Sequence, residues 1–440
     1  MNVLLIFTDQ QQRFSLGCMG NPNVQTPTLD ALARRGTLFR RCYSNDPICG
    51  PFRGTLMTGQ YSSRCGVIDN AYPLRDDATT LADAFNAGGH QTCFIGKWHL
   101  GGNGNRPIAK SLQGGFQRFR GYQCYNGFRD QIVFSDGREY VKHYQGHRTE
   151  IATNLAIEHI REMSQEPQPW MMTLAYQAPH YPVQPAEKYA QMYAGQKIIR
   201  RPNSREVNPF TRTWSPPSPW PPNDDPDYRR YGNDLDEYIR LYYAMCTQVD
   251  ANVARLLETL DELGVGDDTM VIYTSDHGDM HGSHGLTNKG YPQEESAGIP
   301  LIIHVPGSPG GRVSDALVSG IDLMPTLLDL TGLPACETVD GKSFAPLLRG
   351  ESQDLTGPIF SERNKWCMVC QGNWKLAADR TDDHSLMPTL LTNLRDDPYE
   401  LDNRVNAPDA ATKQARLLKT LQEWNRTVWP PERATALGYY

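Results

Sequence analysis

Met1-Asn2-Val3-Leu4-Leu5-Ile6-Phe7-Thr8-Asp9 opens the chain with a run of five apolar residues that ends in a carboxylate. The run predicts a strand over Val3–Phe7, starting almost at the first residue. No basic residues precede it, and it is too short for a signal sequence or a membrane span. We therefore expect a cytoplasmic protein with no membrane partner.

Short apolar runs alternate with helical patterns downstream of this strand. One helix is predicted from Thr26 and Pro27, which suit a cap and a first turn, to Gly36. A long helix is predicted over about 237–263, where apolar residues recur every three or four positions. Further strands are expected at 37–43, 92–95, 170–176, 269–274 and 300–305. The alternation predicts an α/β fold with a large mixed, mostly parallel sheet sandwiched by helices.

The pattern changes near residue 355, where short β-like runs are followed by a closing helix at about 411–428. We expect a large α/β domain over 1–350 and a smaller C-terminal α+β subdomain over 351–440. An irregular proline-rich insertion occupies about 200–232. Loops of this length in compact domains are usually lids, binding loops or disordered segments.

The composition excludes some classes of function. A net charge of −7 and a pI near 5.9 argue against nucleic-acid binding through broad phosphate neutralisation. The ten cysteines have no framework spacing, which fits buried reduced thiols. The close pair Cys367 and Cys370 has no second pair to complete a zinc site, so we expect a structural role for it.

Cys49 lies two residues before Pro51, in Pro47-Ile48-Cys49-Gly50-Pro51-Phe52-Arg53-Gly54. Proline suits the first turn of a helix, so the sulfur should lie at a helix N-terminus, where the macrodipole favours negative charge. Arg53, one turn later, can fold back towards the same point. A nucleophile beside a guanidinium is well placed to attack an anionic ester. Taken alone, a free cysteine beside a structural arginine fits as well.

Polar pairs follow two predicted strands, Asp9-Gln10 after the first and Asp276-His277 after 269–274. Strand ends are where open α/β sheets place their ligands. Two such pairs could nearly enclose one divalent ion through oxygen and nitrogen atoms. A capping aspartate and a core histidine are the alternative for either pair alone.

Three further candidates lie after predicted strands or in late loops: Gly96-Lys97-Trp98-His99, Ala178-Pro179-His180-Tyr181-Pro182 and Lys289. In isolation, Lys97 could be a surface lysine and His99 a half-buried histidine. His281 and His284 could line the substrate side, but we expect loop histidines satisfied by the backbone.

The Cys-x-Pro-x-Arg segment at Cys49, followed by Thr58-Gly59, resembles the signature of type I sulfatases in the alkaline phosphatase superfamily. Gly96-Lys97-Trp98-His99 resembles the second signature of that family. The resemblance implies that a formylglycine-generating enzyme oxidises Cys49 to formylglycine (3-oxoalanine), whose hydrate supplies the attacking hydroxyl. Phe52 departs from the small residue usual in the family.

The resemblance also implies residue roles. Lys97 and Lys289 would hold the sulfate group, His180 would protonate the leaving oxygen, and His99 would act as the base that breaks down the hydrate. Ca²⁺ is the expected metal, with Mn²⁺ as the alternative because glutamine replaces the usual second aspartate. One divalent ion would be bound by Asp9, Gln10, Cys49, Asp276 and His277.

The expected reaction is hydrolysis of the sulfate ester of a sugar, alkyl or aryl alcohol. A phosphonate or phosphate mono- or diesterase using the same site is the nearest alternative, since the two groups share tetrahedral geometry. A catalytically inactive binding homologue is the other. The segment 394–403 resembles the closing Asp-Pro-x-Glu-x-x-Asn segment of the family, for which we expect a structural role.

Overall fold

The computed structural model describes residues 1–102, 107–124, 127–129, 132–135, 141–207, 234–352, 357–381 and 385–429. Most of the predicted proline-rich insertion, 208–232, therefore lies outside the described residues.

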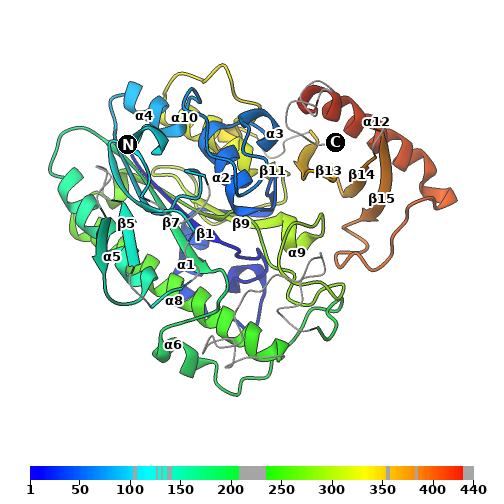
Figure 1. The fold of residues 1–440 in the computed structure, drawn as a ribbon, viewed down its shortest axis with the longest axis horizontal. Helices are drawn as coiled ribbons and strands as arrows, with labels where there is room; N and C mark the ends of the chain where they lie inside the picture. The colour runs from blue at the N-terminus through cyan, green and yellow to red at the C-terminus, as the bar shows by residue number, and fades with distance from the viewer. Residues whose placement is uncertain are drawn as a thin grey trace.

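Within the described residues, eleven strands form one large sheet (Figure 1). The strands in the middle of the sheet, from β8 through β1, β7 and β3 to β4, pair in parallel, whereas β9, β5 and β6 pair antiparallel to their neighbours. The expected mixed, mostly parallel sheet is confirmed. Its order is β10 (Arg312–Ser314), β2 (Thr37–Tyr43), β9 (Gly298–His304), β8 (Thr269–Ser275), β1 (Asn2–Asp9), β7 (Trp170–Pro179), β3 (Gln91–Lys97), β4 (Arg118–Tyr122), β5 (Ile132–Ser135) and β6 (Val141–Tyr144), with β11 (Val318–Ser319) also beside β2.

Helices cover both faces of this sheet, as expected. Side chains alternate along a strand, and β1 accordingly feeds two cores. Leu4 and Ile6 pack with α1 (Pro27–Arg35), α5 (Arg148–Met163) and α8 (Leu235–Glu262). Leu5 and Phe7 pack on the other face with α2 (Cys49–Thr58), α4 (Leu81–Ala87) and α10 (Leu323–Thr331), and Figure 1 shows the two groups of helices on opposite sides.

Shorter elements complete the large unit: α3 (Ser62–Cys65), α6 (Glu187–Met192), α9 (Glu294–Ala297) and α11 (Ala345–Arg349). Single 3₁₀ turns lie at Gly17–Met19, Lys110–Leu112, Gly266–Asp268, Gly320–Asp322 and Pro408–Ala410.

The C-terminal part is a separate antiparallel sheet with one long helix, at the right of Figure 1. It consists of β12 (Ile359–Glu362), β13 (Trp366–Gln371), β14 (Trp374–Arg380), β15 (Leu386–Asn393) and α12 (Ala411–Val428). Leu417 and Leu421 of α12 pack against Cys367 in one core, whereas Cys370 belongs to a second cluster. The two buried thiols therefore pack into different clusters. The separate sheet and its helix confirm the smaller α+β subdomain.

Candidate active site

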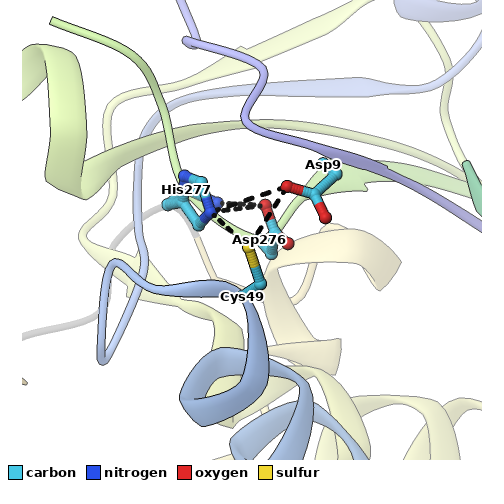
Figure 2. A group of neighbouring side chains, drawn as sticks. All are labelled: Asp9, Cys49, Asp276 and His277. Carbon is cyan, nitrogen blue, oxygen red and sulfur yellow. Dashed lines mark hydrogen bonds and ion pairs between the residues drawn. The ribbon is translucent and has the colours of Figure 1, made fainter. Parts of the chain in front are cut away.

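The parallel strands place their carboxyl ends at one edge of the sheet. Asp9 ends β1, Lys97 ends β3, His180 follows β7 and Asp276 follows β8. The sulfur of Cys49, the first residue of α2, lies among these ends (Figure 2). The structure therefore gathers residues that are far apart in the sequence, as the positions after predicted strands led us to expect.

Cys49 is buried, with 1% of its surface exposed. Its Sγ lies 3.0 Å from Nζ of Lys289, 3.3 Å from Nε2 of His277 and 3.4 Å from Oδ1 of Asp9. Burial raises the pKa of the thiol, but Lys289, Lys97 and His277 outweigh burial and hold this pKa well below its ordinary value. The pocket thus stabilises negative charge at the atom expected to carry the nucleophile.

Arg53 joins the two carboxylates of the site. Its guanidinium donates to Oδ2 of Asp9 at 3.0 Å and to Oδ2 of Asp276 at 3.2 Å. Nζ of Lys97 lies 2.5 Å from the same Oδ2 of Asp9. The cations therefore gather on the Oδ2 atoms, while Oδ1 of each aspartate lies near Nε2 of His277, at 3.7 Å and 3.4 Å respectively.

The donor set fits one divalent metal ion. One ligand atom each from Asp9, Cys49, Asp276 and His277 lies within 4.8 Å of the others (Figure 2). Nδ1 of His277 lies 3.0 Å from the carbonyl oxygen of Gly278, which favours the proton on Nδ1 and leaves the lone pair of Nε2 facing the carboxylates. Burial and the Asp9 carboxylate raise the pKa of Asp276, so a cation placed between the two acids would relieve their repulsion.

Gln10 lies beside these residues in the left-handed region, with φ of 66°. Its backbone N–H donates to Oδ1 of Asp276 at 2.9 Å, and its side-chain oxygen accepts from Nζ of Lys289, also at 2.9 Å. Lys289 therefore links the Gln10 amide to Cys49, since its Nζ contacts both side chains.

The two predicted catalytic histidines have opposite pKa shifts. Burial and Lys289 lower the pKa of His180 to about 4, and its Nε2 lies 3.9 Å from Oδ1 of Asp9. Burial also acts to lower the pKa of His99, but the Cys124 and Cys49 thiols outweigh it, and the pKa is raised. His99 itself has φ of 57°.

Two residues of the site were not identified from the sequence. Cys124 interacts with His99, and although burial raises the pKa of this thiol, Lys97 and His99 lower it to about 6. Asp279 accepts from Nε2 of Gln10 at 2.5 Å. Asp279 lies three residues after Asp276 in the same loop, and this spacing could have identified it from the sequence. Cys124 follows no motif that could have done so.

His281 and His284 lie farther along the loop that carries Asp276. The His281 ring packs edge-on against Tyr242 at 4.2 Å, and its backbone N–H donates to Asp279. Nε2 of His284 lies 3.1 Å from Nδ2 of Asn203.

Comparison with known proteins shows the family. Residues 1–333 match the family model Sulfatase, and residues 282–427 match the model N-sulphoglucosamine sulphohydrolase, C-terminal. The chain is 26% identical over 437 residues to an ulvan-active sulfatase of Formosa agariphila, covering 96% of this chain and 81% of that protein.

Solved structures share the fold. One, in complex with its substrate D-glucosamine-2-N,6-O-disulfate, has a TM-score of 0.85 at 24% identity and covers 98% of this chain and 99% of its own. A phosphonate monoester hydrolase of Agrobacterium radiobacter has a TM-score of 0.76 at 24% identity, covering 97% of this chain and 96% of its own. Because the sulfatase model covers well over half of the sequence, this chain belongs to the sulfatase family, and it is a sulfuric ester hydrolase.

Proposed function

We propose that the protein hydrolyses the sulfate ester of a sugar, with residue 49 carrying the nucleophile after oxidation of its cysteine to formylglycine. The observation that carries the proposal is the position of Cys49. It starts α2, and its sulfur lies within 3.4 Å of an ammonium, an imidazole and a carboxylate. The hydrated aldehyde at this position would supply an oxygen nucleophile that an unmodified thiol lacks.

The charges around Cys49 suit an anionic substrate. Lys97, Lys289 and Arg53 bring three positive charges, against the two carboxylates of Asp9 and Asp276. Nζ of Lys289 already lies 3.0 Å from Sγ of Cys49, so it can contact a sulfate oxygen on a group attached there. Preorganised cations of this kind stabilise charge that develops on the transferred group.

A divalent ion would add positive charge next to the sulfate oxygens when bound. Asp9, Asp276, His277 and residue 49 would hold it, with Gln10 beside them. Ca²⁺ is the proposed ion because most of these donors are oxygen atoms. Mn²⁺ is the alternative, because Gln10 lacks the charge of an aspartate and His277 contributes nitrogen.

His180 is the proposed proton donor to the leaving alcohol. Its Nδ1 lies 2.5 Å from the carbonyl oxygen of Tyr181, so Nε2 is the nitrogen that faces the site. Lys289 contributes to the low pKa of His180. A sulfate monoanion beside both groups would offset that repulsion and favour the protonated imidazole when substrate is bound. His99 is the proposed base that breaks down the hydrate after the alcohol has left.

A sugar is the proposed alcohol because of what similar proteins act on. The relative from Formosa is an ulvan-active sulfatase, and the solved structure with the highest similarity score reported above holds a disulfated glucosamine. A formylglycine-generating enzyme is the proposed partner in maturation. The proposed division remains 1–350 and 351–440, with the insertion at about 200–232.

The proposed location is the cytoplasm. None of the ten cysteines, all of which lie in the described residues, forms a disulfide, which suits a reducing compartment. Within the described part of the chain, no helix is both long and apolar enough to cross a membrane.

A substrate panel tests the proposed function. Protein coexpressed with a formylglycine-generating enzyme would be assayed on sulfated sugars, choline sulfate, aryl sulfates, a phosphonate monoester and a phosphodiester. We expect the highest kcat/KM on a sulfated sugar. A higher kcat/KM on the phosphonate or phosphodiester would contradict the proposal and support the alternative esterase.

A further inference from the structure

The side chain of Gln10 is held between two groups of opposite hydrogen-bonding character. Its oxygen, Oε1, accepts from Nζ of Lys289 at 2.9 Å, and its nitrogen, Nε2, donates to Oδ2 of Asp279 at 2.5 Å. Its backbone is held as well, since the N–H donates to Asp276 and the carbonyl accepts from the Tyr242 hydroxyl at 2.6 Å.

An ammonium can only donate hydrogen bonds, and an ionised carboxylate can only accept them. With Lys289 on one side and Asp279 on the other, a single orientation of the Gln10 amide satisfies both neighbours. That orientation turns the carbonyl oxygen towards Lys289, whose Nζ also contacts Cys49, and the NH₂ group towards Asp279. The rotated amide would place NH₂ against the ammonium and oxygen against the carboxylate.

Asp279 is itself held by further hydrogen bonds. It is buried, with 1% of its surface exposed. The Tyr238 hydroxyl donates to its Oδ2 at 2.9 Å, the backbone N–H of His281 donates to its Oδ1 at 3.0 Å, and Nε2 of Gln12 donates to its carbonyl oxygen at 2.7 Å. A carboxylate anchored in this way can orient a neighbour without moving itself.

We propose that Asp279 is a positioning residue: it fixes the Gln10 amide with its oxygen on Lys289, next to the metal-binding side chains, and it supplies the negative charge that glutamine lacks at position 10. This inference rests on the metal site of the proposed function, but it does not depend on the reaction. It concerns how the site is held, and metal affinity reports it without turnover.

The test is a double-mutant cycle of isosteric changes, Asp279→Asn, Gln10→Glu and the two combined. Metal dissociation constants would be measured by calorimetric titration of Ca²⁺, and separately of Mn²⁺, into chelator-treated protein with unmodified Cys49. The asparagine introduced by Asp279→Asn can donate as well as accept and carries no charge, so only Lys289 then selects the amide orientation and the negative charge beside Gln10 is lost. We expect this single change to weaken metal binding about 10–100-fold, as loss of an outer partner of a metal ligand does.

When Gln10→Glu is already present, we expect no effect of Asp279→Asn on metal affinity. The introduced asparagine can then donate to one oxygen of the introduced glutamate while the other oxygen faces Lys289, so adding Asp279→Asn should not weaken metal binding further. A purely structural Asp279 would produce the same loss with and without Gln10→Glu, and that result would overturn the proposal. Metal binding by the single variant Asp279→Asn within about twofold of the unmutated protein would overturn it too.

Asp250→Asn is the matched control. Asp250 is another buried carboxylate, on α8, and accepts from the backbone of α1, including Leu29 N at 2.8 Å. Its loss should lower thermal stability and leave metal affinity unchanged. If Asp279→Asn does not fold, Gln10→Ala removes the oriented oxygen and should weaken binding by a similar factor; unchanged binding would overturn the proposal. Failure of the proposed function can be told apart from failure of this proposal. In that case the variants would show the expected metal affinities, but the protein would not hydrolyse sulfate esters.

Discussion

Replacing Arg53 by Met tests how the site tolerates its two carboxylates. The guanidinium is 1% exposed, lies 3.0 Å from Asp9 and 3.2 Å from Asp276, and also packs over the Phe7 ring at 4.8 Å. Methionine keeps much of the apolar contact and removes the charge. The two acids would then face one another with Lys97 as the main remaining cation.

The loss can be estimated from these distances. At an effective dielectric constant of about 20, a charge pair about 3 Å apart is worth about 5 kcal/mol before desolvation is counted. Returning the guanidinium to water recovers part of this, and breaking one side of a buried pair usually costs about 3–5 kcal/mol net. We expect Arg53→Met to lower the free energy of unfolding by an amount in that range when a chelator is present. The loss of stability should be smaller with Ca²⁺, because a divalent cation offsets the two buried carboxylates that have lost their guanidinium partner.

Calorimetric melting in EDTA and in Ca²⁺ measures both effects. Arg161→Met is the control, because its pair with Glu262 spans 3.3 Å and both side chains are more than half exposed. Such a surface pair contributes at most about 1 kcal/mol. Equal destabilisation by the two variants in EDTA, or a Ca²⁺-independent loss for Arg53→Met, would show that Arg53 does not offset the two carboxylates.

Three further predictions address other parts of the account. His180→Ala should slow an alkyl or sugar sulfate about 10²–10⁴-fold, and an activated aryl sulfate far less, because only a poor leaving group needs the proton. His99→Ala should show no such selectivity across a leaving-group series, and equal losses for both variants would remove His180 from the acid role. Burial raises the pKa of Asp46 to about 7, above its value in the unfolded chain. The neutral carboxyl therefore stabilises the folded state in acid, and this contribution is lost as the pH rises through about 7. Asp46→Asn should therefore flatten the fall in melting temperature between about pH 4 and pH 7, and an unchanged slope would contradict this. Gly96→Ala should abolish soluble expression, since φ is 108° and an added Cβ would clash with a carbonyl oxygen of β7, whereas Gly89→Ala, at φ of 80° with open space around it, should express.

Much of the fold could be predicted because local signals were strong. β2 and α12 have the predicted bounds, and α1 begins at the predicted proline and ends beside the predicted glycine. Their apolar periodicity and their Pro and Gly boundaries agree with the tertiary packing. α5 and β4 were not predicted, although Ile151, Leu155, Ile160 and Met163 recur in α5 at helical spacing. β4 has only five residues, two of them arginines, so its signal is weak.

The candidate site follows the same division. Asp9, Lys97 and Asp276 could be placed together because each ends or follows a strand of one parallel sheet. The contact between Gln10 and Asp279 spans 269 residues and depends on the path of a loop, so no local pattern specifies it. Lys375 of β14, in the C-terminal sheet, is buried between Glu294 and Glu400. The two ion pairs join residues far apart in the sequence, so no local pattern predicts them.

The proposed nucleophile requires oxidation of the Cys49 thiol, and this oxidation changes the mass of the chain. Intact-protein and peptide mass spectrometry, with and without coexpression of a formylglycine-generating enzyme, would quantify conversion of the thiol to the aldehyde. We expect sulfate ester hydrolysis to rise in proportion to the converted fraction. We also expect Cys49→Ala to abolish hydrolysis while folding and most metal binding persist. Substantial hydrolysis by Cys49→Ala, or by protein in which residue 49 is an unmodified cysteine, would contradict the account.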